Sequence, residues 1–429
     1  MKLTNIATLI MTGSFVVLAG CKTKSVPDSN RGNSASPANQ IQIHPIASTN
    51  QLGSDAKPAK SNAAGQEYPK IDSERHAEFR LHAPSAQRVQ VDIGGHKYDM
   101  TQDDQGNWSV VTPPLVVGFH YYALVVDGVS VNDYNSESFF GVSKMMSGID
   151  VPSGEDFYAA KDVPHGEVRE HWYRSQTNSA WRRCFVYTPP DYDSHPTARY
   201  PVVYLQHGAG EDERGWSTQG HVNFILDNLI AEGRAKPMIV VMDNGGGSAL
   251  FGGGRPAGGL MRGTNAPAGT NRPPTGRFSA MLSGPAGRFP PTLLREIIPM
   301  IDATYRTIPD REHRALAGLS MGGMQTRMIG MAHLETFASL GIFSGGTLGE
   351  LNATNSPLAN PAEFNRLVKV AFISYGSVEG GANGLKTYRD SLAAAGITNL
   401  TTYISPGTAH EWQSWRRSFY QFAPLLFKD

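Results

Sequence analysis

The chain has 429 residues, which is enough for about three domains at most. Its 38 Lys and Arg residues equal its 38 Asp and Glu residues, and this balance argues against a nucleic-acid-binding protein, because phosphate contacts need a clustered basic surplus. A hydrophobic share of 40% excludes global disorder, and a total of two cysteines excludes a disulfide scaffold.

The N-terminus carries the pattern of an export signal. Lys2 precedes an apolar stretch over residues 6–18, and residues 18–21 read Leu-Ala-Gly-Cys. The stretch is shorter than the ~20 apolar residues of a membrane-spanning helix. The ending resembles the bacterial lipobox, which implies a signal peptide over 1–20 and a lipid on Cys21. The alternative is an ordinary cleaved signal with an incidental cysteine. We therefore expect an exported protein, lipid-anchored to a bacterial membrane at the outer membrane or cell surface.

Residues 21–66 are rich in Ser, Asn, Ala, Pro and Gln and poor in branched apolar and aromatic residues. Such a segment cannot bury enough surface to offset its chain entropy. We expect a flexible polar tether between the lipid anchor and the folded body.

Residues 67–160 show short alternating runs separated by turn residues, a pattern typical of a small all-β sandwich. The expected strands cover residues 77–81, 89–93, 108–111 and 120–126.

Parts of this region resemble the immunoglobulin-like modules grouped with family 48 carbohydrate-binding modules, namely residues 79–84, 104–108, 121–122 and 126–128. In such modules exposed aromatic side chains stack on sugar rings. Trp108 and Tyr122, however, fall at positions that more often fill the core of the sandwich. We therefore favour a structural or substrate-shaping role for this domain, and glycan binding stays open.

From residue 165 to 429 strands and helices alternate, which predicts an open α/β sheet with flanking helices. Expected strands lie at 183–187, 200–206 and 238–242, and an expected helix lies at 223–230. The run at 200–206 is almost continuously apolar, as buried parallel strands require.

The most informative motif is Gly-x-Ser-x-Gly at residues 318–322. It follows a strand-like run at 314–319 and precedes an expected helix at 324–334. This strand–turn–helix setting is that of the nucleophile elbow of α/β-hydrolases. Ser320 is therefore the predicted nucleophile.

A serine nucleophile needs a base, and the base needs an orienting acid, which follow in the order Ser, acid, His in α/β-hydrolases. His410 comes after an expected strand and a glycine-containing loop, so it is the predicted base. Glu379 follows the expected strand at 370–376 and is the predicted acid. His333 and Asp390 lie on expected helices, where surface or packing roles are more usual.

The tetrahedral oxyanion needs backbone donors. We expect one from the N–H of Met321 at the start of the elbow helix. The other comes from the glycine-rich loop after the strand at 200–206, with Ala209 favoured and Gly210 as its neighbour. His207 is expected to bond this loop rather than to catalyse.

The second domain resembles carbohydrate esterase family 1, on residues 187–190, 200–208, 227–233, 237–242, 318–323 and 410–416. That family contains feruloyl esterases, acetyl xylan esterases and esterase D-like enzymes, and β modules of the kind described above often precede the feruloyl esterases. The family usually carries Asp where Glu379 stands. α/β-Hydrolases use either acid, so the departure concerns the acid and leaves the serine and the histidine unaffected.

Residues 244–290 contain thirteen glycines and six prolines and follow an expected strand, where active-site loops lie. They form either a substrate-binding lid or a mobile insertion without substrate contact. The candidate substrate-binding residues in this loop and elsewhere are Gly208, Gly210, Trp216, Phe251, Phe278 and Trp412.

The resemblance implies a serine esterase that cleaves feruloyl (hydroxycinnamoyl) esters from plant cell-wall polysaccharide such as arabinoxylan, without a metal or organic cofactor. The alternatives are an acetyl xylan esterase, a siderophore-type (enterochelin-like) esterase, and a surface glycan-binding lipoprotein that is not an enzyme. The neutral charge balance speaks against a highly anionic siderophore as substrate. Cys184, on a buried strand, is expected to be a small apolar filler and not a nucleophile.

Overall fold

The computed structural model describes residues 51–246, 285–351, 353 and 356–428. The predicted signal peptide, Cys21, most of the tether and both Phe251 and Phe278 lie outside these residues. Within the described ranges no helix is both long and apolar enough to cross a membrane.

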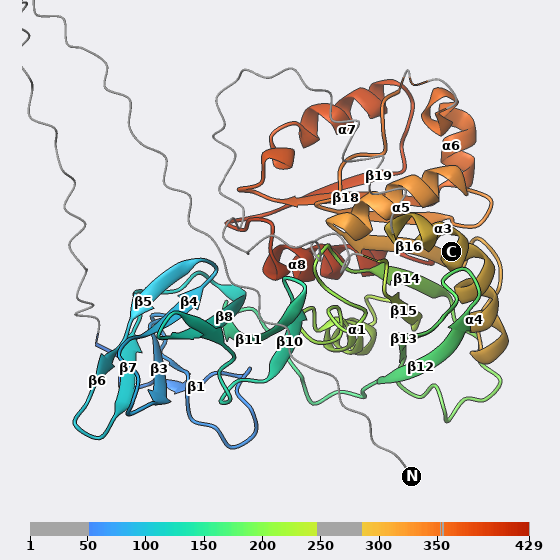
Figure 1. Cartoon of the computed structure of the whole chain (residues 1–429). Coiled ribbons are helices and arrows are strands. Elements are labelled where there is room, and N and C mark those ends of the chain that lie inside the picture. Colours follow the sequence, from blue (N-terminus) through green and yellow to red (C-terminus); the bar gives the residue numbers. More distant parts are fainter. Residues whose placement is uncertain (1–50, 247–284, 352, 354–355, 429) are drawn as a thin grey trace, which may run out of the picture. The chain divides into compact units, whose positions relative to one another are not determined.

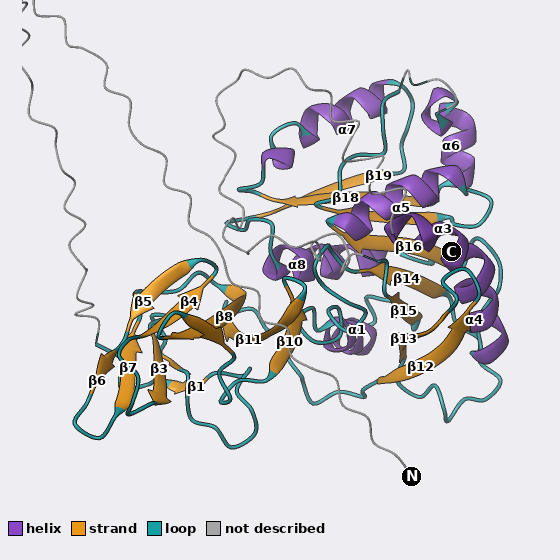
Figure 2. Cartoon of the chain, viewed as in Figure 1, coloured by secondary structure: helices purple, strands orange, loops and turns teal. Residues whose placement is uncertain are grey.

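The β domain consists of two antiparallel sheets (Figure 1; Figure 2). The first has the strand order β1-β2-β3-β7-β6, and the second has the order β10-β11-β8-β4-β5 with β9 paired to β8. The strands are β1 (Lys57–Pro58), β2 (Lys70–Ile71), β3 (Ala77–His82), β4 (Val89–Ile93), β5 (His96–Asp99), β6 (Thr101–Gln102), β7 (Asn107–Val111), β8 (Gly118–Val126), β9 (Val129–Val131), β10 (Ser138–Gly141) and β11 (Lys144–Val151).

Side chains from both sheets share one core, as the alternating pattern predicts. Phe79 of β3 meets Tyr122 of β8 in an edge-to-face contact with 5.1 Å between the ring centroids. Trp108 is buried and donates its indole N–H to the Ala83 carbonyl, and the Tyr122 hydroxyl donates to Asp133. Both aromatic side chains therefore fill the interior, where their faces are closed to a sugar ring.

The expected tether is too long at its C-terminal end. Strand β1 pairs with β2, so residues 57–58 belong to the first sheet. Ser61 is 5% exposed, and its hydroxyl accepts the backbone N–H of Asp150. The segment is held by Ala59 in the apolar core and by the polar contact of Ser61, and composition does not reveal such contacts.

The second domain has an eight-stranded sheet of order β12-β13-β15-β14-β16-β17-β18-β19. The pairs β12–β13 and β13–β15 are antiparallel, and all later pairs are parallel. The strands are β12 (Glu167–Ser175), β13 (Ala180–Thr188), β14 (Val202–Gln206), β15 (Ile239–Asp243), β16 (Arg314–Leu319), β17 (Ser339–Phe343), β18 (Val370–Gly376) and β19 (Leu400–Ser405).

Helices cover both faces of this sheet (Figure 1). Val203 and Leu205 of β14 pack in one apolar cluster with helices α1 and α8, whereas Val202 and Tyr204 pack in another with helices α4 to α7. The helices are α1 (Val222–Ala231), α3 (Phe289–Thr292), α4 (Ile298–Thr304), α5 (Met321–Ala332), α6 (Pro361–Leu367), α7 (Leu385–Ala394) and α8 (Trp412–Phe422). This is the predicted α/β-hydrolase arrangement, although α5 starts three residues earlier than expected.

Cys184 of β13 is fully buried, and burial raises the pKa of its thiol far above the ordinary value. A thiol that stays protonated is a poor nucleophile, so the expectation of an apolar filler is confirmed.

The apolar cluster around α1 and α8 continues into the β domain. Phe119 of β8 and Phe139 of β10 belong to the same cluster as Trp216 and Trp412 of the second domain. The two domains are therefore joined by a shared core.

Candidate active site

Ser320 sits in the turn between β16 and α5, in a backbone conformation (φ 51°, ψ −112°) that L-residues rarely adopt. Such a turn needs small neighbours. A Cβ on Gly322 would lie 2.6 Å from the Gln206 carbonyl oxygen, and one on Gly318 would lie 2.6 Å from the carbonyl carbon of Gly322. The two glycines thus let the elbow approach β14 and present the serine at the carboxyl edge of the sheet.

The predicted nucleophile, base and acid form one hydrogen-bonded chain. The Ser320 hydroxyl lies 2.8 Å from Nε2 of His410. Nδ1 of His410 lies 2.7 Å from Oε2 of Glu379. With the proton on Nδ1, Nε2 is an acceptor that faces the serine hydroxyl, which is the tautomer that a general base needs. The structure therefore brings together three residues that are up to 90 positions apart.

Glu379 is held by more than the histidine. Its Oε1 accepts the Ser344 hydroxyl and the Gly376 backbone N–H, both at 2.7 Å. Burial alone would raise the pKa of this carboxyl, but the hydrogen bonds from His410, Ser344 and Gly376 outweigh burial and lower the pKa below its ordinary value. Glu379 therefore stays ionised beside the imidazole.

Two residues of this arrangement were missed by sequence reasoning. Ser344 follows β17, and the indole N–H of Trp415 donates to its hydroxyl at 3.1 Å. The Trp415 ring also meets the His410 ring edge-to-face, with 5.1 Å between the centroids. The position of Ser344 after the apolar run at 339–343 was a usable signal, since active-site residues gather at the carboxyl ends of such strands.

The loop after β14, residues 207–211, is called the oxyanion loop below. A Cβ on Gly208 would lie 3.4 Å from the Cβ of Ser320, so this loop passes directly beside the nucleophile. Met321 is the first residue of α5, and a first-turn N–H has no acceptor within its own helix. Gly210 has φ +83°, which favours glycine there. The assignment of the Met321 and Ala209 N–H groups as oxyanion donors stays a prediction.

His207 bonds the loop, as expected. It is 1% exposed, its Nδ1 lies 2.7 Å from the Gly208 carbonyl oxygen, and its Nε2 accepts the Gly245 N–H at 3.2 Å. Burial lowers the pKa of this imidazole. A neutral histidine without solvent access fixes the loop and takes no part in proton transfer.

Trp216 and Trp412 are not substrate-binding residues, contrary to the prediction. They are 1% and 2% exposed, and their rings meet edge-to-face in the core under the oxyanion loop. The indole N–H of Trp216 donates to the Gln206 carbonyl. Trp216 lies in a turn region and Trp412 begins α8, and the sequence does not reveal the side on which each ring packs.

His333 and Asp390 lie away from the catalytic residues, as expected. His333 directly follows α5 and pairs with Glu335, and Asp390 pairs with Lys386 one helical turn away on α7. Both pairs are partly exposed to solvent.

The amino-acid sequence is similar to those of two xylan-degrading enzymes and matches the model of one protein family. Over 383 residues the chain is 36% identical to an endo-1,4-beta-xylanase/feruloyl esterase of Xylanibacter ruminicola, and the match covers 87% of this chain and 48% of that protein. It is 23% identical to endo-1,4-beta-xylanase Y of Acetivibrio thermocellus, covering 71% of this chain and 27% of that protein. The chain thus spans less than half the length of these two relatives.

Among solved structures, the enterochelin esterase of Shigella flexneri superposes with a TM-score of 0.55 at 14% identity, covering 82% of this chain and 93% of that chain. At this identity the likeness concerns the fold alone. The Esterase family model matches residues 175–424, a span that contains Ser320, Glu379 and His410. Since this span is more than half of the chain, the chain belongs to the Esterase family.

Proposed function

We propose that this chain is a serine esterase that hydrolyses feruloyl-type (hydroxycinnamoyl) esters on plant cell-wall polysaccharide such as arabinoxylan. The observation that carries the reaction type is the continuous chain of hydrogen bonds from Ser320 through His410 to Glu379. The substrate class is supported by the relative from Xylanibacter ruminicola, which is named for xylanase and feruloyl esterase activity.

In the first half of the reaction the Ser320 oxygen attacks the ester carbonyl carbon. A C–O bond forms, the carbonyl electron pair moves to its oxygen, and the serine proton passes to Nε2 of His410. Glu379 stabilises the imidazolium through Nδ1 without taking its proton. The negative oxygen is stabilised by backbone N–H groups of the oxyanion loop and the start of α5.

The tetrahedral intermediate collapses when the bond to the sugar oxygen breaks. His410 returns its proton to that oxygen, and the sugar alcohol leaves. A water molecule then attacks the acyl-serine, gives a proton to His410, and a second collapse frees the acid and restores the serine. No step needs a metal or an organic cofactor.

The reaction is tested by comparing methyl ferulate, an aryl acetate and a cyclic trilactone siderophore as substrates of the full chain. We expect methyl ferulate to be the best of the three. Ser320→Ala should lower kcat by about 10³-fold or more without unfolding the protein. Undiminished turnover by this variant would exclude the mechanism. Preference for acetate would favour an acetyl xylan esterase, and preference for the trilactone a siderophore esterase.

We further propose that the β domain is an immunoglobulin-like module with a structural rather than a glycan-binding role. The burial of Trp108 and Tyr122 supports this proposal, because buried rings offer no face to a sugar. The test is binding of the Ser320→Ala protein to immobilised arabinoxylan. Retention that survives blocking of the active site with ferulate would contradict a purely structural role.

We also propose that Cys21 carries the lipid that anchors the exported protein to a bacterial membrane. The lipobox-like run at 18–21 supports this. Cys21→Ser should move the protein from the membrane fraction to the soluble fraction. An unchanged distribution would favour the alternative of an incidental cysteine.

A further inference from the structure

The hydroxyl of Tyr121, on β8, joins three segments of the second domain. It donates a hydrogen bond to Oε1 of Glu211 in the oxyanion loop at 3.3 Å. It accepts the side-chain N–H of Gln219 at 2.6 Å and the indole N–H of Trp412 at 3.4 Å. Trp412 stands two residues after His410 and begins α8. One hydroxyl of the β domain thus contacts the oxyanion loop and the segment that carries the base.

Glu211 extends this contact toward the nucleophile. Its side chain is almost fully buried, and its Oε2 accepts the backbone N–H of Gly208 at 3.4 Å. Gly208 is the residue of the oxyanion loop that passes beside Ser320. A displacement of the Glu211 carboxyl would therefore be transmitted to the backbone next to the reacting atoms.

The β10–β11 turn holds the same loop from a second direction. The N–H of Ser143 donates to the Gly210 carbonyl at 2.8 Å. Val142 and Ser143 both have positive φ values, 53° and 63°, as in the tight turns that join antiparallel strands. Two residues of the oxyanion loop, Gly210 and Glu211, are thus bonded to the β domain.

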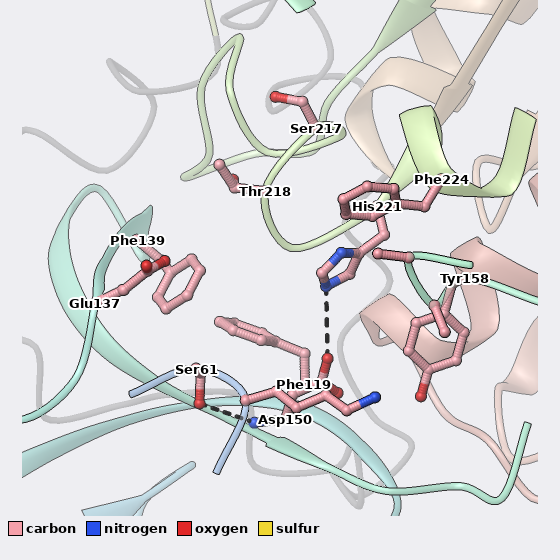
Figure 3. Close-up of a pocket in the computed structure, with 13 residues that line it drawn as sticks. Ser61, Phe119, Glu137, Phe139, Asp150, Tyr158, Ser217, Thr218, His221 and Phe224 are labelled. Atoms are coloured by element: carbon pink, nitrogen blue, oxygen red, sulfur yellow. Dashed lines mark hydrogen bonds and ion pairs between the residues drawn. The ribbon is translucent and has the colours of Figure 1, made fainter. Parts of the chain in front are cut away.

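A buried ion pair fixes the helix after His410 in the same way. Both guanidinium nitrogens Nη1 and Nη2 of Arg416 on α8 contact the carboxylate of Asp150 on β11, at 3.1 and 2.9 Å. Figure 3 shows this carboxylate at the junction of the domains, beside a pocket of about 510 Å³, with the His221 imidazole pointing toward it. The β domain therefore contacts both the oxyanion loop and the helix that follows His410, and these two segments must be aligned for catalysis.

From these contacts we propose that Tyr121 is a positioning residue of the active site, supplied by the β domain, that holds the oxyanion loop and the His410 segment in register. This inference rests on the proposed esterase function. An oxyanion donor acts only within a few tenths of an ångström of its productive place, and misplacement by about 1 Å costs about 10²-fold in rate. Substrate binding in the ground state depends less on this alignment.

The test compares Tyr121→Phe with the wild-type full chain and with Tyr134→Phe. Tyr134 lies in the same domain and is 66% exposed. Tyr134→Phe is therefore a matched control that also removes one tyrosine hydroxyl. For Tyr121→Phe we expect kcat on methyl ferulate to fall about 10- to 100-fold, with KM changed less than twofold. Tyr134→Phe should leave both constants unchanged.

A boronic acid provides a readout that a merely structural role would not change. The boron of phenylboronic acid accepts the Ser320 oxygen while the serine proton passes to Nε2 of His410. One hydroxyl oxygen of the resulting tetrahedral boronate occupies the oxyanion position, so the affinity reports the alignment of the loop. In Tyr121→Phe this affinity should fall in parallel with kcat, while the affinity for free ferulate stays the same. Gln219→Leu removes a donor to the same hydroxyl. It should likewise lower the boronate affinity and leave the affinity for free ferulate unchanged.

Two outcomes would overturn the inference. One is a Tyr121→Phe protein with wild-type kcat and boronate affinity. The other is a loss of activity that follows the folded fraction alone, with the boronate affinity of the folded protein unchanged. If the wild-type chain turned over none of the esters, the proposed function would fail. The boronate comparison would still decide the role of Tyr121, because it needs no turnover.

Discussion

At the scale of single residues, Glu379 shows how an acid is selected by its hydrogen bonds. Three donors converge on its carboxylate, from His410, Ser344 and Gly376. This number of donors keeps the pKa of Glu379 low despite burial. Both carboxylate oxygens of Glu379 are therefore hydrogen-bonded.

Replacing Glu379 by Gln should separate charge from shape. The amide oxygen can still accept from Ser344 and Gly376, but the amide N–H₂ then faces Nδ1 and favours the wrong imidazole tautomer. We expect kcat to fall about 10²- to 10⁴-fold with little change in melting temperature. Steady-state kinetics on methyl ferulate measure the fall. Glu379→Asp is the matched control and should retain more activity, and equal activity of the Gln variant and the wild type would contradict the assignment.

Glu211 gives a prediction about stability and pH. Burial raises the pKa of this carboxyl from 4.5 to about 8, and the carboxyl faces the Tyr121 hydroxyl and the Trp412 N–H, with Asp212 nearby. Between these two pKa values the folded chain keeps a proton that the unfolded chain has lost. The contribution of Glu211 to the free energy of unfolding therefore decreases as pH rises through this window.

The variant Glu211→Gln should remove this decrease in the free energy of unfolding. Each unit of pKa difference corresponds to about 1.4 kcal/mol, so the decrease amounts to a few kcal/mol. Urea unfolding at about pH 5 and about pH 8 would measure it. Glu137→Gln, at an exposed position, is the control. The prediction fails if Glu211→Gln and the wild type show the same change in stability between the two pH values.

At the scale of elements, the elbow depends on the close approach of α5 to β14. A Cβ on Gly322 would lie 2.6 and 2.7 Å from the carbonyl oxygens of Gln206 and His207, which belong to a central strand and the oxyanion loop. Backbone at these positions cannot give way without disturbing the sheet. The glycine is therefore required by packing rather than by its own dihedral angles.

We expect Gly322→Ala to destabilise the protein by about 1–3 kcal/mol, as overpacking of a close contact does. Activity should fall as well, because the strain acts on the oxyanion loop. The free energy of unfolding in urea gives the measurement. Gly384→Ala is the matched control, since a Cβ there meets no atom within 4 Å and its φ is −101°. Equal stability of the two variants would show that the contact can relax.

Many elements with a strong local pattern were predicted well, and others were missed. The runs at 89–93 and 370–376 coincide with β4 and β18. The β10–β11 hairpin, β12 and α8 were not anticipated. In α8 the buried residues Trp412, Trp415, Phe419 and Phe422 recur at helical spacing, so its amphipathic pattern is present in the sequence, although Gln413, Ser414 and Arg416 are buried beside them.

At the scale of the whole molecule, a buried ion pair joins the two domains. Arg416 is fully buried and Asp150 nearly so. Burial would raise the pKa of Asp150, but the charge of Arg416 overrides this and holds the pKa well below its ordinary range. Since the apolar cluster also runs across the junction, the domains should unfold together.

Asp150→Asn leaves the Arg416 charge buried without its counter-ion, which should cost about 3–5 kcal/mol. Asp390→Asn, which removes an exposed pair on α7, should change the stability far less, because solvent screens this pair. Calorimetry of the full chain should show one transition for the wild type. Separate transitions of the two domains in the wild type would contradict the shared core.

Local sequence patterns alone predict Ser320, His410 and Glu379 as nucleophile, base and acid, and they predict the α/β sheet that carries them. These features depend on local spacing: the glycines around Ser320 permit its turn, and Glu379 and His410 each follow a strand, where the sheet brings distant residues to one edge. The burial of Trp108 and Tyr122 also follows from their positions on strands, whereas the packing of Trp216 and Trp412 and the contacts that join the β domain to the site are visible only in the folded chain. The burial of Trp216 and Trp412, the Ser344 hydrogen bond and the contact of Tyr121 with Glu211 result from packing between segments far apart in the chain. Such packing depends on which face each segment turns toward its neighbour, and local spacing does not encode it.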